Sequence, residues 1–224
     1  MINKKFTRPV VIAVDGPAAS GKGTLSNSLA NHFDFARLDT GLIYRALGLK
    51  VLGDGSDASD KQKVILLANQ LSFDDLNQEN LRSEKVGAVA SRVAAIPDVR
   101  AVLLKFQRDF AVHPPAEKSG VVLDGRDIGT IVCPNANFKI FLIADKDVRA
   151  TRRFKELQER GLRAIYSRIL RDMVDRDARD SFRSVAPLEP AKDAFVLDTS
   201  NLSVDATFVA ALEYISAQND DEKW

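Results

Sequence analysis

The sequence predicts an α/β protein in which a five-stranded parallel β-sheet is covered by helices on both faces. Short apolar, β-branched segments alternate along the chain with longer segments of helical periodicity, which is the pattern of parallel strands joined by crossover helices. The first strand runs directly into a glycine-rich loop, and later strands end in charged residues. With 224 residues, the chain can form one domain with an insertion or two small lobes.

Five segments are predicted as buried strands because they are short, apolar and bounded by polar residues: residues 9–14, 35–38, 121–123, 138–143 and 194–197. Segments with apolar residues three and four positions apart are predicted as helices: residues 23–32, 42–52, 147–160, 164–182 and 204–216. Residues 53–60 are predicted as a loop. Residues 61–110 are mostly helical in pattern, and a new helix starts at Pro97.

The composition argues against several classes of partner. Lys and Arg number 32 against 31 Asp and Glu, so the overall charge does not favour nucleic acid or an anionic membrane. The single Cys133 cannot form an internal disulfide, which suits a reducing compartment. The apolar run 10–14 behind two lysines is too short for a signal peptide, and no run approaches the roughly 20 residues that span a bilayer. We therefore expect a cytoplasmic protein.

The loop GPAASGKGT is predicted to bind phosphate. Its glycines allow backbone N–H groups to surround phosphate oxygens, and the following helix adds its positive N-terminal end. We expect Lys22 to reach the β- and γ-phosphates. An ordinary glycine-rich turn is the alternative, but the strand before and the helix after favour phosphate binding. The loop consists of Gly16, Pro17, Ala18, Ala19, Ser20, Gly21, Lys22, Gly23 and Thr24.

Two further motifs follow predicted strands, where ligands of parallel sheets bind. LDTGLIYR brings Asp39, Thr40, Tyr44 and Arg45, although Asp39 or Thr40 could simply be an N-cap. VVLDGRDIG brings Asp124, Arg126 and Asp127, two acids and a cation suited to magnesium and a second phosphate. The alternative for this second motif is a turn with a surface ion pair.

The predicted helix 164–182 has one face that changes from apolar to charged. Steps of three and four residues give Tyr166, Ile169, Met173, Arg176, Asp180 and Arg183. This change predicts that the helix passes over a polar cleft, and a solvated, salt-bridged helix is the alternative. On the preceding helix, Arg149, Arg152 and Arg153 could form a mobile lid over the transferring phosphoryl group or an exposed charged face.

Six ordered blocks resemble those of the bacterial cytidylate kinases, within the nucleoside monophosphate kinases. They are VDGPAASGKGT, LDTGLIYR, ASRVAAIPDVR, LDGRDIGT, RDARDSFRSVAPL and DAFVLDTSNLSVD. The resemblance implies a P-loop kinase fold and transfer of the γ-phosphoryl group of Mg-ATP to CMP or dCMP, in pyrimidine nucleotide metabolism. It also implies a monomer with a core at residues 1–52 and 111–224, a lid at about 147–164 and a CMP-binding insertion at 53–110.

The resemblance also implies roles for single residues. Ser91, Arg100 and Asp127 would contact cytosine, and Thr40, Arg45, Arg126 and Arg183 would surround the CMP phosphate, with Arg176 and Asp180 toward the phosphate and sugar. Lys22, Arg126, Arg153, Arg176 and Arg183 would act in catalysis. Magnesium would be held through water near Thr24 and Asp124 without a direct protein ligand. Such a reaction needs no general base, because the attacking phosphate is already ionised.

Two features depart from the family pattern. Residues 71–87 lack the strand-rich hairpin that is common in the nucleotide-binding insertion, so we expect a more helical insertion. Thr40 stands where Ser is common, which keeps the hydroxyl. A kinase of another small acceptor, such as UMP or shikimate, and a nucleotide-dependent switch or nucleic-acid ATPase are the competing hypotheses.

Overall fold

The computed structural model describes residues 8–221, so the two lysines at the start of the chain lie outside the described part. The chain forms two compact units, Met1–Leu38 with Ala111–Trp224 and, inserted between them in sequence, Asp39–Phe110. We call these the core unit and the inserted unit. The expectation that residues 53–110 form an insertion that binds CMP stays a prediction. The compact inserted unit begins earlier, because the helix at residues 40–54 packs on other helices of that unit.

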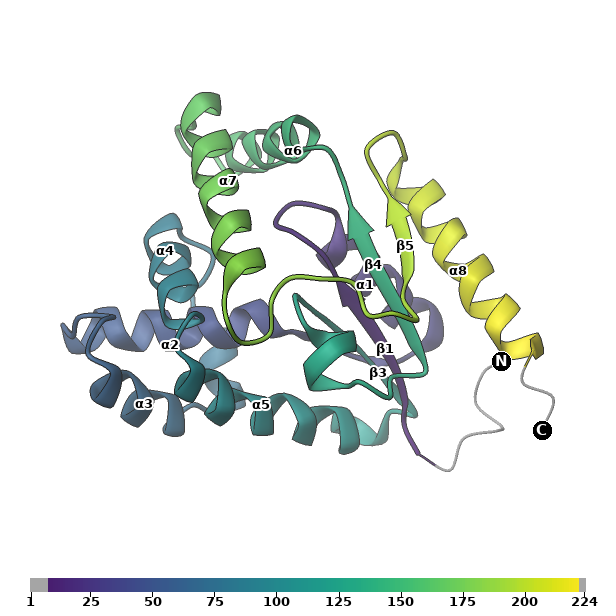
Figure 1. Cartoon of the computed structure of the whole chain (residues 1–224), viewed down its shortest axis with the longest axis horizontal. Coiled ribbons are helices and arrows are strands. Elements are labelled where there is room, and N and C mark those ends of the chain that lie inside the picture. The colour runs from purple at the N-terminus through teal and green to yellow at the C-terminus, as the bar shows by residue number, and fades with distance from the viewer. Residues whose placement is uncertain (1–7, 222–224) are drawn as a thin grey trace. The chain divides into compact units, whose positions relative to one another are not determined.

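The core unit contains the predicted five-stranded parallel sheet (Figure 1). The strand order is β2-β3-β1-β4-β5, so the strand that leads into the glycine-rich loop is central. In register, Val10 pairs with Gly120 of β3, and Ile12 pairs with Phe138 of β4. The strands are β1 (Val10–Asp15), β2 (Ala36–Asp39), β3 (Gly120–Gly125), β4 (Phe138–Ile143) and β5 (Phe195–Asp198).

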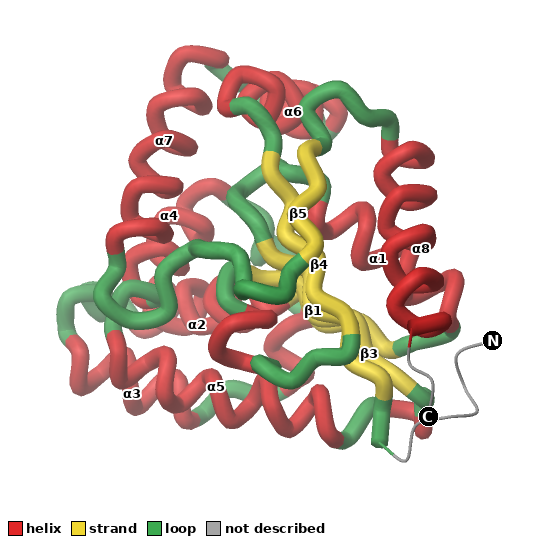
Figure 2. Tube along the Cα trace, turned by 45° about the vertical axis from the view of Figure 1, so that its right-hand side comes forward, coloured by secondary structure: helices red, strands yellow, loops and turns green. Residues whose placement is uncertain are grey.

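Alternation along β1 determines what lies on each face of the sheet. Val10, Ile12 and Val14 face a core cluster with residues of α1 (Lys22–Phe33) and α8 (Val204–Asp221), the two helices on one side of the strands in Figure 2. Asp15 and Ala13 are therefore directed to the other face, where β1 contacts the short π-helix η3 (Ile128–Val132). η3 was not predicted from the sequence.

The predicted helices at residues 147–160 and 164–182 are α6 (Lys146–Glu159) and α7 (Tyr166–Phe182). They pack through a small apolar cluster of Ala150, Leu157, Ile169 and Met173. Tyr166, which the sequence placed on the same stripe, is instead partly exposed, with its hydroxyl donating to the Asp147 carboxylate at 3.2 Å. The apolar part of the α7 face thus begins at Ile169.

The inserted unit is built from helices, as expected from the absence of a strand-rich hairpin in its sequence (Figure 1). α2 contacts α3, η1 and α4. Pro97 is the first residue of α5, as predicted. The elements are α2 (Thr40–Asp54), α3 (Lys61–Asn69), the 3₁₀ helix η1 (Phe73–Asn77), α4 (Glu84–Val93) and α5 (Pro97–Val112), and a second 3₁₀ helix, η2 (Pro115–Glu117), follows in the core unit.

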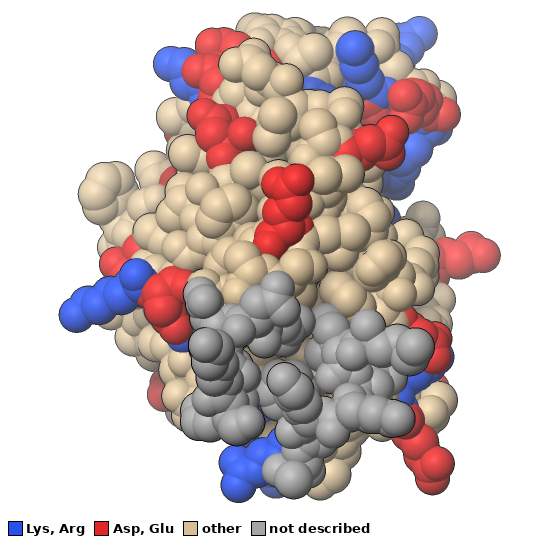
Figure 3. All heavy atoms as spheres, turned by 90° about the vertical axis from the view of Figure 1, so that its right-hand side faces the viewer, with Lys and Arg blue, Asp and Glu red and all other residues tan. Residues whose placement is uncertain are grey.

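The charge balance is also visible on the surface. On the face shown in Figure 3, Lys and Arg side chains are interspersed with Asp and Glu and do not form a patch of one sign. Within residues 8–221, no helix combines the length and the hydropathy required to cross a membrane.

Candidate functional site

The glycine-rich loop joins the carboxyl end of β1 to the first turn of α1. Gly16 has φ of +145°, and a Cβ atom there would lie 2.2 Å from the Leu142 carbonyl oxygen, so only glycine fits. Gly21 also has a positive φ, of +95°. These conformations turn the backbone in the way that phosphate-binding loops require. The nine loop residues thus adopt the predicted strand–loop–helix arrangement, and phosphate binding by them stays a prediction.

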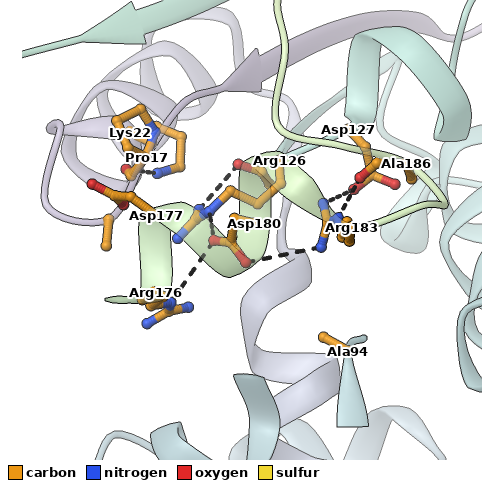
Figure 4. Close-up of polar contacts among 12 residues, drawn as sticks. Pro17, Lys22, Ala94, Arg126, Asp127, Arg176, Asp177, Asp180, Arg183 and Ala186 are labelled. Carbon is orange, nitrogen blue, oxygen red and sulfur yellow. Dashed lines mark hydrogen bonds and ion pairs between the residues drawn. The ribbon is translucent and has the colours of Figure 1, made fainter. Parts of the chain in front are cut away.

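Lys22 is buried at the start of α1, and its Nζ donates to the Pro17 carbonyl oxygen at 2.6 Å (Figure 4). Burial, followed by the positive charges of Arg126 and Arg176, lowers the pKa of Lys22 well below its ordinary value, and Asp124 and Asp15 only partly oppose this. A bound anion would favour the charged ammonium form. The loop is therefore electrostatically suited to an anionic ligand.

Three arginines surround the buried carboxylate of Asp180 on α7. Arg126 Nε lies 2.9 Å from Asp180 Oδ2, and Arg176 and Arg183 each approach the carboxylate at 3.9 Å (Figure 4). Burial alone would raise the pKa of Asp180, but the three guanidinium groups outweigh it and hold that pKa below its ordinary value. We call these four residues the arginine cluster. It carries more positive than negative charge, as an anion-binding site requires.

Arg183 lies just after α7 and connects the arginine cluster to Asp127. Its Nε donates to the Ala186 carbonyl oxygen, and its Nη2 lies 4.0 Å from Asp127 Oδ1. Both side chains are buried. The predicted change of the α7 face from apolar to charged therefore ends beside Asp127, at the carboxyl end of β3.

Asp15, which was not predicted as a site residue, is the last residue of β1 and is buried against η3. Its two carboxylate oxygens accept hydrogen bonds from the backbone N–H groups of Ile128 and Gly129, each at 2.8 Å. Desolvation raises the pKa of Asp15 to about 6, with a smaller contribution from Asp127, although the two backbone N–H groups and Lys22 oppose the increase. The sequence did contain one signal for Asp15, since it is an acidic residue at the end of an apolar strand and directly precedes Gly16.

The raised pKa of Asp15 predicts a pH-dependent difference in stability between the wild type and Asp15→Asn. The native state binds the Asp15 proton more tightly than the unfolded chain, so the wild type loses stability as pH rises from about 4 to about 6, by on the order of 3 kcal/mol. Asn cannot titrate, and the other carboxyl groups cancel in the comparison. Urea unfolding at several pH values should show that the stability of the variant increases relative to that of the wild type across this pH range. A stability difference that does not change with pH would contradict the raised pKa of Asp15.

The three arginines considered for a lid on α6 make separate contacts. Arg149 is buried, with Nη1 2.6 Å from Asp177 Oδ2 and 3.2 Å from the Ala18 carbonyl oxygen. Arg152 donates to Thr199, and Arg153 pairs with Glu156 at 2.7 Å on the same helix. The alternative of an exposed charged face is wrong for Arg149, which is buried and ties α6 to the glycine-rich loop and α7. The catalytic role of Arg153 and the movement of residues 147–164 stay predictions.

The residues near the expected magnesium position offer oxygen atoms, the ligands that this ion prefers. Thr24 is exposed in the first turn of α1, and Asp124 lies at the end of β3. Arg37 Nε and Nη2 both donate to Asp124 Oδ2, at 3.2 and 2.9 Å. Within residues 8–221, no cluster of three or more His, Cys, Asp or Glu side chains could enclose a metal. The hydroxyl of Thr24 and the carboxylate of Asp124 are oxygen donors of the kind that fit magnesium, and binding of the ion there stays a prediction.

The remaining predicted residues belong to the inserted unit. Arg45 Nη1 donates to the carbonyl oxygens of Leu81 and Ser83, and Gly87 allows the guanidinium to pass, since a Cβ atom there would lie 2.9 Å from it. The Arg100 guanidinium lies 5.6 Å from the centre of the Tyr44 ring. Thr40 and Ser91 are buried on α2 and α4. The contact between these two helices brings polar residues from separate motifs into one unit.

Comparison with known proteins identifies the family. The family model described as cytidylate kinase matches residues 12–217. The chain belongs to the cytidylate kinase family. Curated members that are similar to it include the cytidylate kinases of Paramagnetospirillum magneticum, 56% identical over 93% of this chain and 98% of the relative, and of Methylocella silvestris, 50% identical over 94% and 96%. The cytidylate kinase of Rhodospirillum rubrum is 50% identical over 92% and 97%.

Solved structures that resemble the chain support the fold. A gluconokinase from Sinorhizobium meliloti aligns with a TM-score of 0.52 and 13% identity, covering 95% of each chain. An uncharacterized protein from Eubacterium ventriosum aligns with a TM-score of 0.53 and 16% identity, covering 93% of this chain and 99% of the other. The P-loop kinase fold that the sequence predicted for this cytidylate kinase family member is thus confirmed.

Proposed function

We propose that the protein transfers the γ-phosphoryl group of Mg-ATP to CMP or dCMP, giving CDP or dCDP and ADP. The arginine cluster is the observation that carries this proposal, because three guanidinium groups around one carboxylate provide several donors for a second phosphate. A nucleotide-dependent switch would need the phosphate-binding loop but not this second cationic group. Membership of the cytidylate kinase family supports CMP as the acceptor.

In this mechanism the protein positions two anions and stabilises the charge that moves between them. The backbone of residues 16–24 would hold the β- and γ-phosphates, and Lys22 would neutralise charge on the γ-phosphoryl group. Arg126, Arg176 and Arg183 would bind the CMP phosphate, while Asp180 keeps the three guanidinium groups in place. The phosphate of CMP is the nucleophile and is already ionised, so no general base is needed.

A bound magnesium ion would supply positive charge that reduces the repulsion between the donor phosphates and the CMP phosphate. Thr24 and Asp124 would hold its water ligands. Arg37, which donates twice to one Asp124 oxygen, would fix the orientation of that carboxylate. Arg153 on α6 would add positive charge near the γ-phosphoryl group if residues 147–164 act as a lid.

Different side chains would recognise the base and the phosphate of CMP. In the inserted unit, Ser91 and Arg100 would contact the cytosine ring and Thr40 and Arg45 the phosphate, with Tyr44 supporting Arg100 through their ring–cation contact. In the core unit, Asp127 would accept a hydrogen bond from the cytosine amino group. UMP carries a carbonyl oxygen at that position, so it would face the carboxylate unfavourably.

The reaction can be tested by incubating the purified protein with Mg-ATP and, separately, CMP, dCMP, UMP, AMP or no acceptor, while ADP release is followed. We expect rapid turnover with CMP and dCMP only. Equal ADP release without an acceptor would contradict the kinase assignment, and a preference for UMP would replace the proposed acceptor. Stimulation by DNA or RNA alone would favour a nucleic-acid ATPase.

Replacing Asp127 by Ala is expected to reduce the ratio of kcat/KM for CMP to that for UMP at least about tenfold, because the acceptor of the cytosine amino hydrogen is lost. Steady-state kinetics with both nucleotides measure this ratio directly. The exposed Asp172→Ala on α7 removes a carboxylate elsewhere in the core unit and should keep the wild-type ratio. An unchanged ratio in Asp127→Ala would assign this residue another function.

We further propose that the protein acts as a monomer in the cytoplasm, with small nucleotides as its ligands. The absence of a membrane-spanning helix within residues 8–221 and the mixed surface charge in Figure 3 support this proposal. Size-exclusion chromatography with light scattering at several concentrations tests the oligomeric state.

A further inference from the structure

The π-helix η3 begins directly after Asp127, yet Asp127 does not cap it. The first N–H groups of a helix lack partners within the helix, and an Asp at the N-cap position ordinarily accepts one of them. Asp127 occupies the N-cap position but makes no such hydrogen bond through its side chain. Its buried carboxylate instead lies near the Arg183 guanidinium, at 4.0 Å.

Asp15 accepts those hydrogen bonds from the neighbouring strand. Its Oδ1 accepts from Ile128 N–H and its Oδ2 from Gly129 N–H, both at 2.8 Å, so each oxygen satisfies one donor at the start of η3. The side chain is almost fully buried. A Cβ atom on Gly129 would lie 3.5 Å from Asp15 Oδ2, at ordinary van der Waals contact, so the side chain packs directly against this residue.

Asp15 also anchors the other side of the same short segment. As the last residue of β1, it pairs in register with Gly125, the last residue of β3. Arg126 and Asp127 therefore lie between two points that Asp15 holds. On one side, the backbone of Gly125 pairs with Asp15. On the other side, the N–H groups of Ile128 and Gly129 donate to the Asp15 side chain. Because Gly16 follows Asp15, the same residue adjoins the start of the phosphate-binding loop.

We propose that Asp15 is a positioning residue that caps η3 in place of Asp127 and so keeps the Asp127 carboxylate directed to the acceptor nucleotide. The inference rests on the proposed contact between Asp127 and cytosine. Without Asp15, the unsatisfied N–H groups of Ile128 and Gly129 would draw the carboxylate of Asp127, which occupies the N-cap position, into a capping hydrogen bond. Base discrimination would then fall although Asp15 does not touch the base.

Asp15→Asn tests this proposal, because Asn can accept one N–H but presents an NH₂ group to the other. We expect the CMP to UMP ratio of kcat/KM to fall at least about tenfold. The control for lost stability is Ile140→Val, which shortens a buried side chain of the adjacent strand β4 without reaching η3. Ile140→Val should keep the wild-type ratio even if its unfolding temperature falls as far as that of Asp15→Asn.

The outcomes separate the inference from the proposed function. If Asp127→Ala loses discrimination but folded Asp15→Asn keeps it, the positioning role is overturned while the role of Asp127 stands. If Asp127→Ala also keeps the ratio, the proposed contact with cytosine fails and the inference fails with it. Loss of the ratio in Ile140→Val would show general loosening of the site and would equally overturn the inference.

A second measurement does not depend on the folding of Asp15→Asn. In Asp127→Ala the amide hydrogens of Ile128 and Gly129 should exchange as slowly as in the wild type, because Asp15 still binds them. Hydrogen exchange followed by NMR on both proteins reports these two positions. Faster exchange of both amides in Asp127→Ala would show that Asp127 is their cap and would overturn the proposal.

Discussion

Arg183→Ala is expected to lower kcat/KM for CMP by about 100- to 1,000-fold while the fold is retained. One well-oriented donor to a developing charge contributes a loss of this size when it is removed. Arg183 is buried beside both Asp127 and Asp180, so it combines the proposed phosphate site with the proposed base site. The fold should survive, because Arg126 still lies 2.9 Å from Asp180 and compensates that buried charge.

The matched control is Arg179→Ala, which removes an exposed arginine from the last turn of α7. Its kcat/KM should stay within about threefold of the wild type. Arg183→Lys keeps the charge but loses the planar fork of donors, so it should recover only part of the activity. Circular dichroism and thermal unfolding establish that each variant is folded. A folded Arg183→Ala enzyme with wild-type kinetics would remove Arg183 from the site.

The parts of the site that lie at strand ends were predictable from the sequence. β1 and β3 are neighbouring parallel strands, so Gly16 and Arg126, which follow them, lie at the same edge of the sheet. The spacing of four residues also predicted that Arg176 and Asp180 share a face of α7. Strand ends and helical periodicity can both be recognised in a single sequence, because each depends on the order and spacing of neighbouring residues.

Contacts that depend on tertiary packing were not predictable in this way. Asp180 is closest to Arg126, 54 positions away, and no periodicity relates the two. The sequence left Arg149 open between a lid and an exposed face, and neither alternative indicated that its side chain contacts the Ala18 carbonyl oxygen and Asp177. Asp15 is a positioning candidate only because η3 lies on its face of the sheet, and η3 itself is too short to show a hydrophobic pattern.

Lys22→Met is expected to reduce turnover at least about 100-fold and yet raise the free energy of unfolding by about 1–4 kcal/mol. The ammonium group is the proposed partner of the γ-phosphoryl group, so its loss removes charge stabilisation in the transition state. In the protein without nucleotide, however, Lys22 is buried close to Arg126 and Arg176, which lower its pKa. A Met side chain of similar length occupies the same space without that cost.

The stabilisation by Lys22→Met should depend on pH in a definite direction. Because the native state holds the Lys22 proton less tightly than the unfolded chain, the wild type gains stability as pH rises from the lowered pKa toward the ordinary value. The advantage of the variant is therefore greatest at low pH and shrinks in alkaline solution. Urea unfolding of both proteins across this range, without nucleotide, measures the difference.

Lys139→Met is the matched control, because Lys139 is also buried but its Nζ lies 2.7 Å from Asp193 Oδ2 and 2.6 Å from the Pro134 carbonyl oxygen. Its replacement breaks a formed ion pair, so stability should fall and turnover should stay near the wild type. The two buried lysines thus differ in their partners: Lys139 pairs with a carboxylate, whereas Lys22 donates to the Pro17 carbonyl oxygen and is proposed to bind a substrate phosphate. If Lys22→Met lowers stability as Lys139→Met does, Lys22 is satisfied by the protein alone, and its proposed role toward the γ-phosphoryl group loses its electrostatic basis.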